Sequence, residues 1–454
     1  MLSAAQRAEP ELLTVSSSSD IHGSVVNDTV VRRNCTLHVR GNVLGSLTIE
    51  PGAKVVVEGS VDGKIFNKGG KLVVNNKGLA ACVTLDGPPE ALAGGILKIN
   101  LSALAANFEA LTKRTEAECA GVVKGNAYGC GIEPIAGALA QTGCKTLFVS
   151  NLPEAKRVRA VAPKAVIYVL NGLYSGSGPA FAEVDARPVI NSAIEMAEWD
   201  AFVASSHWQG GYALNVDTGE SRLGLSAEEA AAFASRVDSP DHGITLVMSR
   251  LDRADKRDSQ LNDRQIELFR EVRRLYRGVP ASLADSSGIF LGAKAHCDLV
   301  RVGATLYGVN PTPGLPNPML SVLELRARIV QIRNLAPGET IADNPGWVAQ
   351  RRTRLALVSV GYADGYPRPA NGADHKLQAV IGTHRCPLAG QPATDLLAID
   401  VTDLPDPTVA RFGALATLIG DGIGIDELAA AAKSPGREVL SRLGHRFHRI
   451  YFAI

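Results

Sequence analysis

The first hundred residues alternate apolar and polar positions in short runs that glycine interrupts at a regular spacing. The triplets Gly23–Val25, Gly41–Val43 and Gly59–Val61 recur every 18 residues, and apolar residues take every second position between them. Short strands at a fixed period are typical of a solenoid, in which each coil stacks on the next. We therefore predict a β-solenoid over residues 21–85, after a disordered segment at 1–20. A small β-sandwich with evenly spaced turns is the alternative.

A different pattern begins after residues 86–95, where Gly-Pro-Pro and Gly-Gly predict a linker. Strand-length apolar runs then alternate with segments of helical periodicity, the first strand being Ile96–Asn100. This alternation over residues 96–325 predicts a (β/α)8 barrel, with a doubly wound parallel sheet as the alternative. Residues 326–454 contain mainly strand-like runs and predict a separate C-terminal β domain. The expected fold class is therefore α/β plus β, preceded by the short solenoid.

Composition and charge exclude several classes of protein. The 454 residues are too many for one hydrophobic core, and a formal net charge of +1 gives no footprint for nucleic acid or an anionic membrane. No apolar run reaches membrane-spanning length, and the N-terminal segment lacks the apolar centre of a signal peptide. The seven cysteines are scattered without a CxxC pair, which suits a reducing compartment and predicts no metal site. We expect a soluble cytoplasmic protein.

One loop contains the most informative chemistry in the chain. The stretch Gly121–Gly131, GVVKGNAYGCG, places Lys124 directly after a buried strand and among glycines. In a (β/α)8 barrel, that position is the carboxyl-terminal rim, where active sites lie. A lysine partly removed from water has a lowered pKa and can form an imine with an aldehyde. By composition alone, a solvated surface lysine is the alternative.

The whole loop is similar to the VVKANAYGHG signature of the alanine racemases, from which it differs at Gly125 and Cys130. Further segments resemble motifs of the same family in the same order. They are residues 99–107 (the opening strand and helix), 217–224 (DTGESRLG, compared with DTGMxRLG), 301–308 (RVGATLYG, compared with RPGxxLYG) and 360–368 (VGYADGYPR). The resemblance implies a fold-type III amino-acid racemase that depends on pyridoxal 5'-phosphate, takes a small amino acid and forms a homodimer with shared active sites. The solenoid lies outside it and resembles bactofilin-like β-helical segments.

The resemblance also implies roles for the residues that should hold the cofactor. Lys124 would carry pyridoxal phosphate as a Schiff base and act as one acid/base group on the substrate Cα. Tyr128 and Ser286 would hydrogen-bond the phosphate, together with backbone amides near Gly303. Arg301 would contact the pyridine nitrogen and, because it keeps its proton, would limit protonation of the ring.

Four more positions are singled out by the same comparison. Arg222 would lie near the 3'-oxygen of the cofactor and near the substrate. Thr394, in the β domain, replaces a methionine whose backbone N–H faces the substrate carboxylate. His445 stands where the family often has a phosphate-binding tyrosine, and Asn215 where many members have lysine.

Two departures concern the second proton donor that racemisation requires. The family segment GExVxYGxTxxA corresponds to GETIADNPGWVA here, which puts Asp343 at the tyrosine position. Arg250 replaces the histidine that pairs with that tyrosine in the family. An Asp343–Arg250 ion pair would be a coherent substitute, but arginine lowers the pKa of a carboxylate and makes it a poorer proton donor. Tyr307, Tyr362 and Tyr366 are the alternatives that the sequence leaves open.

Three hypotheses about function follow. The first is an amino-acid racemase, with alanine as the default substrate. The second is another pyridoxal-phosphate reaction that protonates from one face, such as that of a lyase, an aldolase or a decarboxylase, and loss of the tyrosine favours it. The third is a scaffold protein with a degenerate racemase module, and the intact Lys124 loop argues against it.

Overall fold

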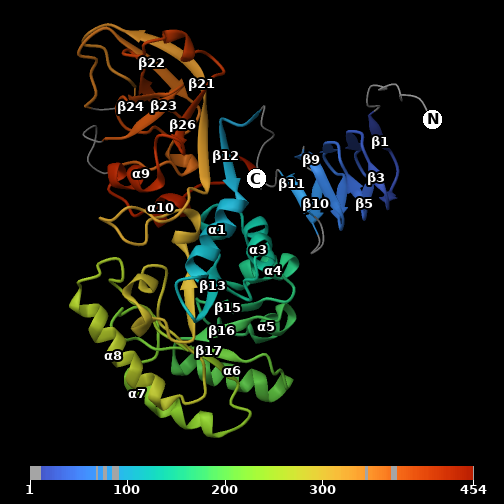
Figure 1. Cartoon of the computed structure of the whole chain (residues 1–454), viewed down its shortest axis with the longest axis vertical. Coiled ribbons are helices and arrows are strands. Elements are labelled where there is room, and N and C mark those ends of the chain that lie inside the picture. The colour runs from blue at the N-terminus through green and yellow to red at the C-terminus, as the bar shows by residue number, and fades with distance from the viewer. Residues whose placement is uncertain are drawn as a thin grey trace, which may run out of the picture. The chain divides into compact units, whose positions relative to one another are not determined.

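The protein consists of two compact units (Figure 1). The structure, a computed structural model, describes residues 12–67, 70–74, 79–83, 92–342, 346–369 and 376–452. One unit is Ala103–Val322, and the other combines the flanking segments Met1–Ser102 and Leu323–Ile454. None of the helices described by the structure has the length and hydropathy that crossing a membrane requires.

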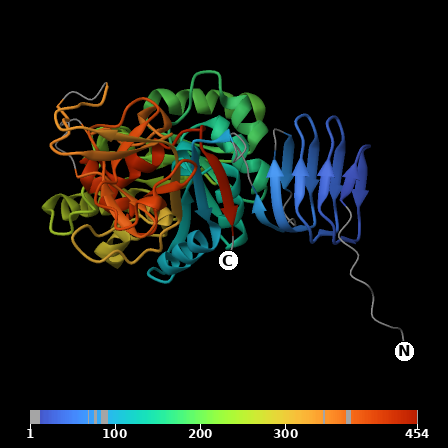
Figure 2. The same ribbon diagram turned by 90° about the horizontal axis from the view of Figure 1, so that it is seen from above.

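The N-terminal residues form a parallel β-solenoid, whose stacked strands Figure 2 shows side by side. Ser24 pairs with Asn42, and Asn42 with Ser60, so each coil advances by the 18 residues of the sequence repeat. Parallel pairing confirms the solenoid and excludes the sandwich, whose sheets are antiparallel. The strands are β1 (Leu13–Val15), β4 (Thr29–Val31), β7 (Leu47–Ile49), β9 (Ser60–Asn67) and β11 (Leu79–Val83) on one path, β3 (Ser24–Val25) and β6 (Asn42–Val43) beside them, and β2 (Ser19–Ile21), β5 (Thr36–Val39), β8 (Lys54–Val57) and β10 (Lys71–Val74) in the other sheet.

Two of the three repeated glycines, Gly41 and Gly59, are needed because successive coils approach closely there. A Cβ on Gly41 would lie 2.1 Å from the carbonyl oxygen of Gly23, and no side chain fits in that space. Inside the coils, stacked valine, leucine and isoleucine side chains form a buried core. The prediction of disorder through residue 20 is wrong for β1 and β2, because their apolar positions Val15 and Ile21 already belong to that core or pack against it.

The C-terminal domain begins with a strand that precedes the barrel in sequence. β12 (Gly95–Asn100) pairs antiparallel with β21 (Leu323–Leu335) and parallel with β27 (His448–Phe452), so its prediction as a barrel strand is wrong. An apolar run of six residues does not reveal which sheet it joins. The other elements of the domain are β22 (Thr353–Val358), β23 (Gln378–Ile381), β24 (His384–Pro387), β25 (Leu397–Asp400), β26 (Leu415–Ile419), α9 (Ile425–Ala432) and α10 (Gly436–Ser441).

The other unit is the predicted (β/α)8 barrel. Its eight parallel strands follow the order β19-β18-β17-β16-β15-β14-β13-β20, and a backbone bridge between Asp285 and Arg301 joins the two ends. The strands are β13 (Glu118–Val122), β14 (Thr146–Val149), β15 (Val166–Val169), β16 (Arg187–Ile190), β17 (Tyr212–Asn215), β18 (Ile244–Met248), β19 (Ala281–Ser282) and β20 (Leu299–Val302). The helices are α1 (Leu101–Thr112), α2 (Lys124–Tyr128), α3 (Ile132–Gln141), α4 (Leu152–Val161), α5 (Gly178–Val184), α6 (Ala193–Ser206), α7 (Ala227–Phe233) and α8 (Gln260–Leu275).

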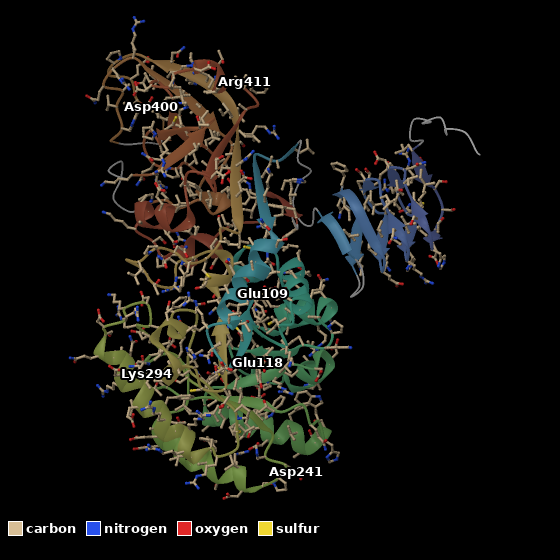
Figure 3. All side chains as sticks on the ribbon, viewed as in Figure 1. Glu109, Glu118, Asp241, Lys294, Asp400 and Arg411 are labelled. Atoms are coloured by element: carbon tan, nitrogen blue, oxygen red, sulfur yellow. The ribbon has the colours of Figure 1, made fainter. Side chains whose placement is uncertain are left out.

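The barrel brings the predicted cofactor residues to one rim. Lys124 follows β13, Arg222 follows β17, Arg250 follows β18, Ser286 follows β19, and Gly303 follows β20. The carboxyl ends of parallel barrel strands all face the same way, so these five positions share the face on which barrel enzymes carry their active sites. Figure 3 labels Glu118, which marks the opposite, amino-terminal end of β13.

Candidate active site

Lys124 begins a turn of unusual backbone geometry. Residues 125–128 all have positive φ, with values of 64°, 55°, 54° and 52°, although only Gly125 is a glycine. Left-handed backbone costs about 1–2 kcal/mol for each residue with a side chain. Such strain persists where the surroundings enforce it, and it is typical of functional turns. Backbone hydrogen bonds close the turn, from Ala127 N to Val123 O at 2.8 Å and from Gly129 N to Gly125 O at 2.9 Å.

A buried carboxylate ties this turn to the neighbouring loop. Glu154, 9% exposed, accepts a hydrogen bond from Asn126 N on Oε1 and another from Ser150 N on Oε2, each at 2.9 Å. The backbone of Glu154 is itself held, because its N–H donates to the Asn151 side chain that caps α4. Sequence reasoning missed Glu154, since the capping pattern predicts the start of a helix but not a contact with the lysine turn.

Replacing Glu154 with alanine is expected to destabilise the protein by about 1–3 kcal/mol, because two partly buried backbone N–H groups lose their acceptor. The loosened turn should also weaken retention of the cofactor. Chemical denaturation and equilibrium dialysis of the cofactor measure the two effects. Glu183→Ala is the matched control, since Glu183 is 68% exposed and pairs with Lys156 at the surface. Equal unfolding free energies for Glu154→Ala and the wild type would contradict this role.

The surroundings of Lys124 favour its neutral, nucleophilic form. Burial is the largest cause of the lowered pKa of its amine, followed by the positive charges of Arg250 and Arg222. The charges of Glu220 and Glu154 oppose the shift. A lowered pKa leaves more of the amine unprotonated near neutrality, as attack on an aldehyde requires.

Three residues assigned to phosphate binding meet at one point of the rim. Ser286 Oγ accepts a hydrogen bond of 2.8 Å from Gly303 N. A Cβ on Gly303 would lie 2.6 Å from the Tyr128 hydroxyl oxygen, so that hydroxyl also lies at Gly303. The Tyr128 ring packs against Tyr307, with ring centroids 5.1 Å apart. Two hydroxyls and a glycine backbone therefore form a small polar cradle next to the lysine turn.

Arg301 is buried inside the barrel, with 5% exposure. Its guanidinium donates to Ser282 Oγ and to the carbonyl oxygens of Ser249 and Leu283. Burial lowers its pKa to about 10, so the group still carries its proton at neutral pH. Arg301 is therefore a fixed hydrogen-bond donor and not an acid/base group.

Arg222 and Arg250 share a carboxylate that sequence reasoning missed. Glu220 Oε1 accepts from Arg222 Nη2 at 2.8 Å and from Arg250 Nη1 at 2.9 Å. Asp285 lies 3.8 Å from Arg250 Nε. Asp343, the predicted partner of Arg250, is outside the described residues, and Arg250 already has these two carboxylates in the barrel. Glu220 stands at the methionine of DTGMxRLG, and that departure was the available signal.

The C-terminal domain contains the remaining predicted residues. His445 is exposed, and the exposed Thr394 pairs its hydroxyl with that of Tyr362 at 2.8 Å. Of the three tyrosines considered as proton donors, Tyr366 and Tyr307 are buried, and burial raises the pKa of both. Tyr362 is 40% exposed and is therefore the accessible one of the three.

Both halves of this architecture match family models. Residues 99–311 match the alanine racemase N-terminal domain, and residues 322–451 match the alanine racemase C-terminal domain. Together the two matches cover most of the chain and begin after the solenoid. They include the lysine turn, the polar cradle and the three arginines Arg222, Arg250 and Arg301.

Known proteins resemble the same part of the chain. An alanine racemase of Methylobacterium sp. (strain 4-46) is 47% identical over 359 residues, which is 79% of this chain and 98% of the relative. A biosynthetic alanine racemase of Agrobacterium fabrum is 39% identical over 78% of this chain and 93% of the relative. The crystal structure of alanine racemase from Bartonella henselae with covalently bound pyridoxal phosphate matches with a TM-score of 0.73 and 32% identity, over 79% of this chain and 99% of that one. This chain belongs to the alanine racemase family.

Proposed function

We propose that the protein is a pyridoxal-phosphate-dependent isomerase that interconverts L- and D-alanine and works as a cytoplasmic homodimer. The observation that carries the proposal is Lys124, held at the barrel rim in a strained turn with its pKa lowered. Membership of the alanine racemase family supports the reaction, and the covalently bound pyridoxal phosphate of the Bartonella henselae structure supports the cofactor.

The barrel offers a group for each part of pyridoxal phosphate. The Lys124 amine suits the aldehyde, the cradle of Tyr128, Ser286 and Gly303 suits the phosphate, and the buried guanidinium of Arg301 suits an acceptor such as the pyridine nitrogen. When bound, the cofactor supplies an electron-withdrawing ring that stabilises negative charge at the substrate Cα. Since Arg301 keeps its proton, it would donate a hydrogen bond to the ring of the bound cofactor without protonating it, which suits racemisation.

The chain's own residues must then move a proton on and off Cα from two sides. Lys124 is the group for one face, because its lowered pKa lets the amine accept a proton near neutrality. Arg250 is excluded as the second group, since a guanidinium does not release its proton in this range. Asp343 and Tyr362, both in the C-terminal domain, are our candidates for the opposite face. The 40% exposure of Tyr362 supports it over the buried Tyr307 and Tyr366.

Deuterium exchange at Cα in D2O, followed by chiral analysis of the alanine, tests the reaction. Exchange with inversion is the expected result. Exchange with retention would contradict racemisation and favour one-face chemistry, and no exchange would favour a scaffold. Asp343→Asn and Tyr362→Phe identify the second donor, because the variant that lacks it should still exchange the proton but lose inversion.

A further inference from the structure

A single carboxylate oxygen at the barrel rim holds two arginines. The Oε1 atom of Glu220 accepts from both Arg222 and Arg250, at 2.8 and 2.9 Å. Because both guanidinium groups reach the same atom, they lie next to each other. Two guanidinium groups that bind the same oxygen atom would repel each other without an anion between them, and Glu220 is that anion. Its side chain is 18% exposed, so water screens the three charges only in part.

The loop that carries Glu220 is built to hold it still. Asp217 Oδ1 accepts hydrogen bonds from the backbone N–H groups of Gly219, Glu220 and Ser221, at 2.8, 2.9 and 3.1 Å. Gly219 and Ser221, on either side of Glu220, both have positive φ. A neighbouring network fixes the backbone of Arg250, whose carbonyl accepts from the buried Gln265 side chain at 2.9 Å. Glu220, in the loop after β17, and Arg250, in the loop after β18, are thus held by separate hydrogen bonds.

The arginines keep donors to spare. A guanidinium has five N–H groups, and Glu220 takes one from each arginine. The Arg222 side chain is 59% exposed and that of Arg250 is 36% exposed, so N–H groups that bond to none of the described residues can reach solvent at the rim. Asp285 Oδ2, at 3.8 Å from Arg250 Nε, is too distant for a hydrogen bond, and Asp285 Oδ1 accepts from the backbone of Ser287 and Gly288.

Two positions have changed together relative to the family motifs. Glu220 stands at the methionine of DTGMxRLG, and Arg250 stands at the histidine that pairs with the tyrosine in the family. Arg250 without Glu220 would bring a second unpaired cation toward Arg222, whereas Glu220 with Arg250 forms the observed bridge. The two departures therefore belong to one structural arrangement, the bridge from Arg222 through Glu220 to Arg250.

We propose that Glu220 is a positioning residue that holds Arg222 and Arg250 together as a two-arginine receptor for the carboxylate of the bound amino acid. The proposal rests on the proposed function and adds Arg250 to the groups that recognise the substrate. Two adjacent guanidinium groups match a carboxylate in charge and in donor geometry. In this arrangement Arg250 binds an anion, whereas the family histidine that it replaces pairs with the proton-donating tyrosine.

The test uses the cofactor-loaded enzyme and propionate, a carboxylate that lacks the amine of alanine. For Glu220→Gln we expect the Kd of propionate and the KM of alanine to rise by about tenfold, because loss of the charge frees the arginines. The kcat should change by less than about threefold, since the carboxylate is bound equally before and during the proton transfer. Glu220→Asp keeps the charge and should recover part of the affinity.

A spectroscopic pH titration gives a readout that a purely structural role would not move. In the apoenzyme, the negative charge of Glu220 raises the pKa of the Lys124 amine, so its removal should shift the midpoint of the pH dependence of cofactor attachment, followed by absorbance, to lower pH. Glu267→Gln, which breaks the exposed pair with Arg270 on α8, is the control and should change neither measurement. Unchanged propionate affinity and an unchanged midpoint in Glu220→Gln would overturn the proposal, as would loss of the cofactor from both Glu220→Gln and Glu220→Asp. Failure of the proposed function would appear separately, as wild-type enzyme that exchanges no Cα proton of alanine.

Discussion

Replacing Lys124 with alanine is expected to abolish covalent attachment of pyridoxal phosphate and to lower racemase activity by at least about a thousandfold, or about 4 kcal/mol. Lys124 supplies both the amine that binds the aldehyde and one of the two proton-transfer groups, so a single substitution removes two functions. The visible absorption band of the bound cofactor should disappear. Borohydride reduction followed by peptide mass analysis should then find no cofactor adduct on residues 121–131.

Lys294→Ala is a suitable control, because Lys294 is about half exposed, pairs with Asp263 and lies outside the lysine turn (Figure 3). It should leave the absorption band and the labelled peptide unchanged. Survival of the band in Lys124→Ala would mean that another lysine holds the cofactor. In that case the buried Lys124 would not be the cofactor anchor.

The second large effect is expected from Gly303→Ala. The added methyl group would lie 2.6 Å from the Tyr128 hydroxyl oxygen, closer than nonbonded atoms come, and would fill the proposed phosphate cradle. Forcing a methyl group into a packed site costs about 1–3 kcal/mol, so we expect affinity for pyridoxal phosphate to fall by roughly tenfold to a hundredfold. Fluorescence titration of apoenzyme with the cofactor measures the change.

A double substitution separates crowding from general damage. Tyr128→Phe removes the oxygen that the new methyl group would meet, so the pair Gly303→Ala and Tyr128→Phe should bind the cofactor better than the sum of the two single effects predicts. Gly137→Ala is the matched control, because nothing lies within 4 Å of its added Cβ and alanine favours the helix α3. Strictly additive losses would show that the clash does not carry the effect.

Much of the barrel was predictable because its signals are local. β13 is an apolar run before a glycine-rich loop, and α8 has helical periodicity over 16 residues. β19 has only two residues, which is too short for any periodicity to register. β12 was assigned to the wrong unit because its partners β21 and β27 lie hundreds of residues further along the chain, and no local pattern records such pairings.

The residues of the candidate site also fall into two groups, those that a local motif reveals and those that depend on contacts between distant segments. Lys124, Tyr128 and Gly303 lie within contiguous motifs, so their roles could be predicted from the family resemblance before the geometry was known. Glu154 and Glu220 act through contacts between loops that follow different strands, and such contacts depend on closure of the barrel. The expected Asp343–Arg250 pair stays a prediction because Asp343 lies outside the described residues, and Glu220, a third departure, lies against Arg250.

The pairing of β11 with β27 has a consequence for how the chain is made. Val83 at the end of the solenoid pairs with Tyr451, roughly 370 residues later. At about 5–20 residues per second, the ribosome delivers that partner on the order of 20–70 s after β11 has emerged. Meanwhile the barrel, whose strands are contiguous in sequence, can close while β11 and β12 both present unpaired edges. The period of greatest vulnerability to aggregation should therefore fall late in translation, and slowing the final 130 codons should reduce the yield of soluble protein more than slowing the barrel codons.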